Sequence, residues 1–251
     1  MKNQDFKLLL TVTAILFASF TNAASATTCQ GVTATIVGTS GADTLNGTPG
    51  RDVMAGLGGD DLINGFGSDD IICGGSGDDL INGGSGNDRI NGDDGDDNID
   101  GNAGDDKMSG GTGDDNMRGG LGNDNMSGDK GNDQISGDKG NDTLDGNDGS
   151  DSVSGGKGID RIRGGHHNDI LSGGSSNDIM NGDTGKDTIN GEDGDDSIDG
   201  GEGSDDISGD NGNDHITGGT GTNDNCTPDL NDDDSGCETE DTTQQQEQDN
   251  D

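Results

Sequence analysis

Aliphatic side chains recur at every ninth residue over most of the chain. Residues 38–217 divide into twenty nine-residue units without insertion or deletion, and the eighth position of every unit is Ile, Leu, Met or Val. The seventh and ninth positions are mostly polar. Because alternate residues of a strand point to opposite faces, the eighth side chain is predicted to face inward and its neighbours outward. Each unit therefore predicts a strand too short to be stable alone.

Glycine and aspartate occupy the other invariant positions of the unit. The first position is Gly and the sixth is Asp in all twenty units, and the fourth is Gly in seventeen, the exceptions being Ser68, His167 and Ser176. Glycine permits the positive φ and the close backbone approach that tight turns require. Two units then close one coil of 18 residues, and ten coils at a strand spacing of about 4.8 Å form a rod of roughly 48 Å. The predicted fold is all-β.

The unit resembles the calcium-binding nonapeptide G-G-x-G-x-D-x-U-x of RTX proteins, as residues 74–82 (GGSGDDLIN) illustrate. The resemblance covers residues 38–217 and implies a parallel β-roll, or β-solenoid, of about twenty repeats that calcium stabilises. In that family six residues of each unit turn around calcium and three form a strand. The opening over residues 29–39 and the segment 72–75 are similar to the start of secreted bacterial RTX-like proteins.

The strongly acidic composition predicts that the chain binds cations. Acidic residues number 53 and basic residues 12, for a net charge of −41, and Trp and Tyr are absent. Such a chain repels phosphate and has few rings for base stacking, so we expect neither nucleic-acid binding nor membrane insertion. Burying twenty aliphatic side chains yields about 1.5–3 kcal/mol each, whereas ordering the backbone costs about 1–2 kcal/mol per residue. We expect the chain to be largely unfolded without metal.

Calcium would both neutralise the negative charge and stabilise the fold, because it takes six to eight oxygen ligands from carboxylates and carbonyls. Turns at one edge of successive coils lie 18 residues apart, so an ion between two turns could take a carboxylate oxygen from each. Nine gaps on each edge allow up to about eighteen Ca²⁺ ions, whose charge would nearly neutralise the net −31 of residues 38–217. A role in Asx-turns is the alternative for the sixth-position aspartates. The acids at positions two and five are expected to contribute a general negative electrostatic field and not to act as calcium ligands. The predicted ligands are Asp43, Asp52, Asp61, Asp70, Asp79, Asp88, Asp97, Asp106, Asp115, Asp124, Asp133, Asp142, Asp151, Asp160, Asp169, Asp178, Asp187, Asp196, Asp205 and Asp214.

The ends of the chain differ from the repeats. Residues 1–26 combine Lys2 and Lys7, an apolar run and an A-x-A-like site, which predicts a secretory signal peptide. We expect an N-terminal cap strand over 27–37, the β-roll over 38–217, a degenerate repeat and disulfide-closed cap over 218–237, and a disordered acidic tail over 238–251. Asn223 and Asn225 stand where the next unit needs Asp and an aliphatic residue, so the solenoid is predicted to stop after residue 217.

Four cysteines in an exported chain predict disulfides. Cys29 with Cys73 and Cys226 with Cys237 are the expected pairs, although spacing alone leaves other pairings open. An acidic calcium loop over residues 225–237 is the alternative to a simple cap. The adjacent pair His166–His167 is interpreted as a weakened calcium turn, with a transition-metal site as the alternative.

No motif of a known catalytic site occurs, so we predict no enzymatic activity. The predicted function is that of an exported, multi-site calcium-binding repeat protein that folds on Ca²⁺ outside the cytoplasm, whether extracellular, periplasmic or at the cell surface. The alternative is a structural or adhesive rod that contacts envelope polysaccharide and whose calcium is purely structural.

Overall fold

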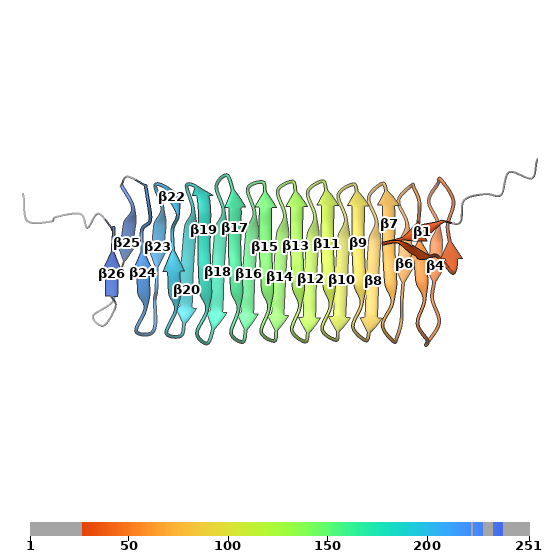
Figure 1. The fold of residues 1–251 in the computed structure, drawn as a ribbon, viewed down its shortest axis with the longest axis horizontal. Helices are drawn as coiled ribbons and strands as arrows, with labels where there is room; N and C mark the ends of the chain where they lie inside the picture. Colours follow the sequence, from red (N-terminus) through yellow and green to blue (C-terminus); the bar gives the residue numbers. More distant parts are fainter. Residues whose placement is uncertain (1–26, 222, 228–232, 238–251) are drawn as a thin grey trace, which may run out of the picture.

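The chain forms a rod in which parallel strands stack side by side along one long axis (Figure 1). The computed structural model describes residues 27–221, 223–227 and 233–237. The predicted signal peptide over 1–26 and the predicted tail over 238–251 lie outside the described residues. Within that described part every regular element is a strand, and no helix long and apolar enough to cross a membrane occurs there. The all-β parallel solenoid predicted from the repeat is confirmed.

Two parallel sheets form the walls of the rod, and the chain passes from one sheet to the other at each turn. The first sheet contains β4 (Thr44–Asn46), β6 (Leu62–Asn64), β8 (Leu80–Ser85), β10 (Asn98–Ala103), β12 (Asn116–Leu121), β14 (Gln134–Lys139), β16 (Ser152–Lys157), β18 (Ile170–Ser175), β20 (Thr188–Asp193), β23 (Asp206–Ser208) and β25 (Asn225–Thr227). The second contains β3 (Ile36–Val37), β5 (Val53–Ala55), β7 (Ile71–Ser76), β9 (Arg89–Asp94), β11 (Lys107–Thr112), β13 (Asn125–Lys130), β15 (Thr143–Asp148), β17 (Arg161–His166), β19 (Ile179–Gly185), β21 (Ser197–Asp199), β24 (His215–Thr217) and β26 (Asp233–Ser235), while β22 (Glu202–Gly203) pairs with β19.

The register between neighbouring strands confirms the 18-residue coil. Asn116 of β12 pairs with Asn98 of β10 on one side and with Gln134 of β14 on the other. The same spacing relates the strands of the second sheet, where Met108 pairs with Ile90 and Met126. Each residue of a unit therefore lies beside its equivalents one coil away.

The strands of the central coils are longer than the three residues expected from the family resemblance, and that expectation is wrong here. Strands β7 to β18 run for six residues, from position seven of one unit to position three of the next. The reason is that the backbone at positions two and three also pairs in register, as Asn102 does with Gly120 and Ala103 with Leu121. Only positions four to six remain as the turn at the edge.

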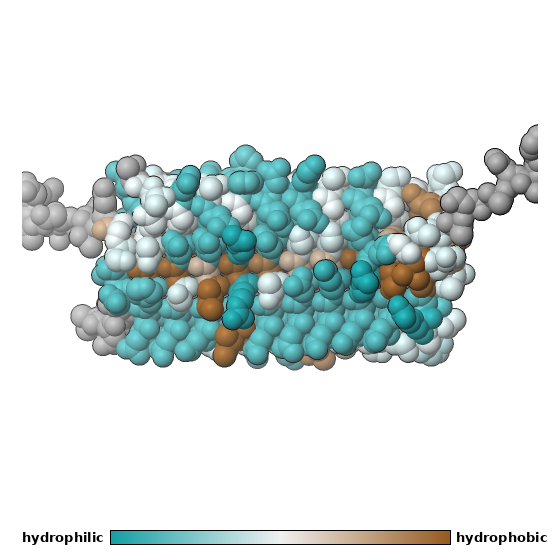
Figure 2. Space-filling view, viewed as in Figure 1, coloured by the Kyte–Doolittle hydropathy of each residue, from teal (hydrophilic) through white to brown (hydrophobic). Residues whose placement is uncertain are grey.

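Two facing rows of aliphatic residues, one from each sheet, fill the space between the sheets. The eighth residue of every unit from Leu45 to Ile216 belongs to a single cluster, and most of these side chains are at most 2% exposed. Most of the surface seen in Figure 2 is hydrophilic, with apolar atoms near the end that carries β1 and β4 and in a narrow band along the middle of the rod. The predicted inward orientation of position eight is observed throughout the rod.

A hairpin covers part of the outer face at the N-terminal end. Strands β1 (Thr28–Cys29) and β2 (Val32–Thr33) pair antiparallel. Cys29 packs with Val53, Ala55 and Ile71 in a second, smaller apolar cluster. The disulfide Cys29–Cys73 joins this hairpin to β7. The positions in β5 and β7 that would otherwise face solvent are therefore buried.

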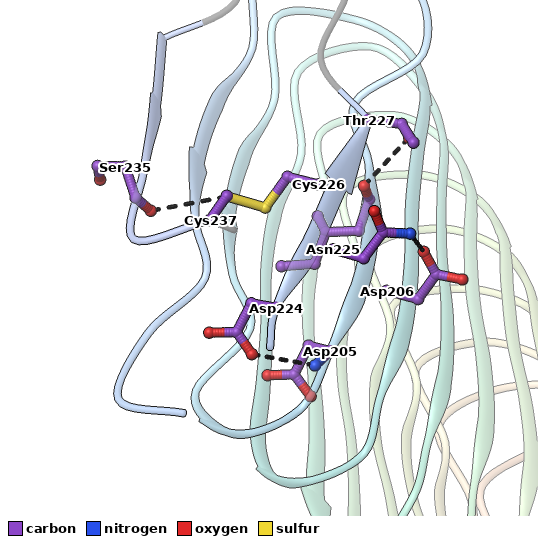
Figure 3. Close-up of a disulfide and its surroundings, with 9 residues drawn as sticks. Asp205, Asp206, Asp224, Asn225, Cys226, Thr227, Ser235 and Cys237 are labelled. Atoms are coloured by element: carbon purple, nitrogen blue, oxygen red, sulfur yellow. Dashed lines mark hydrogen bonds between the residues drawn. A yellow bond between two sulfur atoms is a disulfide. The ribbon is translucent and has the colours of Figure 1, made fainter. Parts of the chain in front are cut away.

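The solenoid continues beyond residue 217, contrary to the prediction that it stops there. One residue is inserted in the next unit, and Asp224 and Cys226 take the places of the sixth and eighth residues. Asp224 is 2% exposed and Cys226 joins the core row. Figure 3 shows Asp224 beside Asp205 and the disulfide that joins Cys226 to Cys237, the second expected pair. The nine-residue template missed this unit because it allowed no insertion.

Replacing one core side chain tests how much the row contributes. We expect Ile135→Ala to lower the free energy of unfolding of the calcium-loaded rod by about 2–5 kcal/mol, because it leaves a cavity in a closely packed row. Gln134→Ala on the exposed neighbouring position is the control and should change it by less than about 0.5 kcal/mol. Denaturant unfolding followed by circular dichroism measures both. Equal effects of the two substitutions would contradict the assignment of position eight as the core.

Candidate metal centre

The sixth-position aspartates form two ladders, one along each edge of the rod. The backbone N–H of Asp106 donates to Oδ1 of Asp124 at 2.8 Å, and the N–H of Asp124 donates to Oδ1 of Asp142 at 2.7 Å. The same bond repeats along both edges, from Asp43 with Asp61 to Asp205 with Asp224. Each carboxylate therefore reaches one coil toward the N-terminus, and the topology brings together aspartates 18 residues apart as predicted.

The second oxygen of most of these carboxylates is buried and has no protein partner. This holds for Oδ2 of every sixth-position aspartate from Asp61 to Asp205. The side chains themselves are at most 3% exposed. An ionised carboxylate removed from water without a compensating partner costs several kcal/mol, so such groups are normally paired or coordinate a metal. A row of orphaned oxygens at 18-residue spacing is the feature that a cation would satisfy.

Burial raises the pKa of these aspartates strongly. The pKa of Asp97 and Asp133 rises from the ordinary 3.8 to about 7, and that of Asp124 rises to about 6. Loss of solvation is the largest cause, and the N–H donated by the aspartate one coil earlier opposes it. Neighbouring carboxylates in the same ladder raise the pKa of Asp97 and Asp133 further. Without a counter-ion the folded rod therefore disfavours the charged form of its own ladder.

Glycine at position four lets backbone carbonyls line the same edge. A Cβ added to Gly140 would lie 1.5 Å from the carbonyl oxygen of Gly122, one coil earlier, and one added to Gly104 would lie 1.9 Å from that of Gly86. Any side chain at these points would collide with the carbonyl. Successive fourth-position carbonyls thus point along the edge toward the next coil.

The donor set fits a hard cation bound mainly by oxygen. Within the described residues no three His, Cys, Asp or Glu side chains converge on one point. An ion at the edge would therefore combine carboxylates of the ladder with backbone carbonyls of the turns. Calcium accepts such mixed, irregular oxygen shells, whereas Mg²⁺ demands near-octahedral geometry and gives up its water reluctantly.

The first two turns depart from this pattern. Oδ2 of Asp43 accepts bonds from the N–H and the hydroxyl of Thr39, and Oδ2 of Asp52 accepts the same two bonds from Thr48. The predicted set of twenty ligands did not distinguish Asp43 and Asp52 from the other aspartates. The signal that could have revealed this difference is Thr at the second position, which occurs in these two units alone among the twenty.

Position five forms a further ladder that sequence analysis did not foresee. The N–H of Asn123 donates to Oδ1 of Asp105 at 2.8 Å, and the N–H of Asn141 donates to Oδ1 of Asn123 at 2.8 Å. The interpretation of these acids as a general field is therefore incomplete, because they also join the turns of successive coils. Asp and Asn share an acceptor oxygen, which explains why both residues occur at this position.

The histidine pair does not form a cluster of metal ligands. His166 Nδ1 lies 3.0 Å from the hydroxyl of Thr184, and His167 Nε2 lies 3.4 Å from Oδ1 of Asp148. His167 has a φ of 78° at position four, where glycine is usual. Its turn keeps the ladder, because the N–H of Asp169 donates to Oδ1 of Asp187.

Comparison with known protein families identifies the class of protein to which the chain belongs. The family model described as the RTX calcium-binding nonapeptide repeat matches eight overlapping segments that together run from residue 34 to residue 224: 34–63, 46–81, 74–108, 82–117, 109–144, 145–180, 172–207 and 199–224. These segments cover well over half of the chain. The chain therefore belongs to the RTX calcium-binding nonapeptide repeat family, and calcium binding by its repeats follows from that membership.

One solved structure similar to the chain is the X-ray structure of a hyperactive, Ca²⁺-dependent, β-helical antifreeze protein from an Antarctic bacterium. The two share 20% sequence identity over 77% of this chain and 82% of that one, with a TM-score of 0.43. No curated protein matches the chain.

The raised pKa values predict how the metal-free rod responds to pH. Because the folded pKa exceeds the ordinary 3.8, the folded chain holds protons that the unfolded chain releases between about pH 4 and 7. The free energy of unfolding therefore falls as pH rises through this window. We expect metal-stripped protein to show more β-structure by circular dichroism at pH 5.5 than at pH 8, at constant ionic strength. Saturating calcium should abolish the loss at pH 8, and a gain of β-structure from pH 5.5 to 8 without metal would contradict this account.

Proposed function

We propose that the chain is an exported, multi-site calcium-binding rod that folds when its edge aspartates bind Ca²⁺ outside the cytoplasm. The observation that carries the proposal is the row of buried Oδ2 atoms without a protein partner, from Asp61 to Asp205 on both edges. With one ion shared by each two successive turns, all twenty units would hold up to about eighteen ions, and the seventeen aspartates from Asp61 to Asp205 alone would hold fifteen. The sixth-position aspartates would supply the carboxylate ligands and the glycine turns the carbonyls.

Export is supported by the leader pattern of residues 1–26 and by the cysteines. We propose that this leader is removed. The roll would then bind calcium with a Kd of roughly 10⁻⁴–10⁻³ M, as other extracellular calcium-binding modules do. Both disulfides, Cys29–Cys73 and Cys226–Cys237, are consistent with an oxidising compartment. Coupling of folding to metal would keep the chain unfolded where calcium is scarce.

The outward-facing rows give the rod a surface for a further partner. Asp100, Asn102, Arg118 and Lys139 line one shallow hollow on the first sheet together with the apolar Leu121. Groups of this kind form hydrogen bonds with sugar hydroxyls, so envelope polysaccharide is the partner class of the alternative, adhesive role. Retention of the calcium-loaded protein on polysaccharide, with loss in chelator, would favour that role over calcium binding alone.

A calcium titration of the chain from residue 27 tests the proposal directly. We expect a cooperative rise of β-structure in the far-ultraviolet circular dichroism spectrum as Ca²⁺ increases to about 1 mM, and little response to Mg²⁺. The transition is cooperative because each ion joins two coils. A spectrum that stays disordered at about 10 mM Ca²⁺ would contradict the proposal. So would full β-structure in chelator at pH 8.

A single aspartate tests the sharing of ions between turns. Asp124→Asn retains one acceptor oxygen for the N–H of Asp106 but removes the charge between two gaps. We expect isothermal titration calorimetry to show about two fewer ions bound, one on each side of the turn. Asp114→Asn removes the same charge from exposed position five, which Asn already occupies at residue 123, and should leave the stoichiometry unchanged. Unchanged stoichiometry and affinity in Asp124→Asn would exclude Asp124 as a ligand.

A further inference from the structure

Two kinds of turn occur along the edges of the rod. In the first kind, Thr39 donates its N–H and hydroxyl to Oδ2 of Asp43 at 2.6 and 2.8 Å, and Thr48 does the same for Asp52 at 2.6 and 2.9 Å. In the second kind, which begins with Asp61, Oδ2 has no protein partner. The first kind is complete without a cation, because side chain and backbone satisfy the carboxylate.

The backbone at position two accompanies this difference. Leu57, Phe66 and Gly75 hold φ values of 82°, 75° and 121°, in the left-handed region. Thr39 and Thr48 are not among the residues with positive φ. A β-branched residue strongly disfavours left-handed φ, so Thr at position two selects the closed turn locally. The choice between the two turns is therefore encoded by one residue in each unit.

The closed turns coincide with the other features that stabilise structure without metal. The disulfide Cys29–Cys73 spans the same coils. The second apolar cluster, with Cys29, Val53, Ala55 and Ile71, occurs on these coils in addition to the core row. Strand β7 pairs with β9, and β8 pairs with β10. An ordered N-terminal end therefore provides strands with which the next coil can pair.

We propose that residues 29–73 form a nucleus held without metal by the closed turns of Asp43 and Asp52, the second apolar cluster and the disulfide, even though Asp61 and Asp70 near its end already carry an orphaned oxygen. Calcium then adds coils to this nucleus in the N-to-C direction, beginning at the gaps that follow Asp61 and Asp70. The inference rests on the proposed calcium-driven folding, and it adds where folding starts and which aspartates are exempt from metal. In a linear array each coil is stabilised by its neighbour, so a preformed end removes the cost of starting the first coil.

Hydrogen exchange by mass spectrometry on the full disulfide-bonded chain tests the nucleus. In chelator at pH 8 we expect peptides from residues 29–73 to exchange at least about tenfold more slowly than peptides from residues 110–200. Added Ca²⁺ should protect both regions. Uniformly fast exchange in chelator followed by protection in calcium would overturn the nucleus but leave the proposed function intact. Uniform protection in chelator would overturn both.

The paired substitution Thr39→Val with Thr48→Val removes both hydroxyl donors and retains β-branching. In chelator we expect exchange over residues 39–73 to accelerate about tenfold or more, because a hydrogen bond to a charged group is lost in each turn. The matched Thr39→Ser with Thr48→Ser variant retains the hydroxyls and should retain protection. Circular dichroism in saturating calcium checks that both variants fold. Equal exchange of the Val and Ser variants in chelator would show that the closed turns do not stabilise the nucleus.

Discussion

The buried carboxylate shared between neighbouring turns is the constraint on which the rest of the rod depends. One of its oxygens accepts the N–H of the aspartate one coil earlier, as Asp124 does from Asp106. The other is buried without a protein partner along most of both edges. Desolvation raises the pKa of these groups, which means that the polypeptide alone does not compensate their charge. The same group that aligns the coils therefore creates the demand for a cation.

This arrangement explains how a chain with so few buried apolar residues forms an ordered rod. Along most of the described rod the apolar core consists of the two facing rows between Leu45 and Ile216, which is thin for a chain of this length. Hydrogen bonds between coils, from the strands and from the ladders at positions five and six, hold each coil to its neighbours. Stability is then a sum over neighbouring coils, and under the proposed function an ion between two turns would strengthen the contact on which that sum depends.

The departures from the repeat have physical roles at both ends. At the N-terminal end Thr39 and Thr48 close their turns internally, and a disulfide-bonded hairpin buries the outer face of β5 and β7. At the C-terminal end one inserted residue still allows Asp224 and Cys226 to extend the ladder and the core. Disulfides thus stabilise both ends of the described stack, where a coil has a described neighbour on one side only.

The solenoid, its 18-residue coil, the inward aliphatic rows and the aspartates along each edge could all be predicted from the sequence, because each follows from a strict nine-residue period and the alternation of a strand. The sequence also indicated both disulfide pairs. Which oxygen of each aspartate is satisfied became visible only in the folded rod, because one oxygen takes a partner 18 residues away, although Thr at position two carries a local signal for the closed turn. The six-residue strands, the ladder of Asn123 and its equivalents, and the extra unit at Asp224 were likewise invisible to a local template. They arise from backbone pairing between coils, which no single repeat contains.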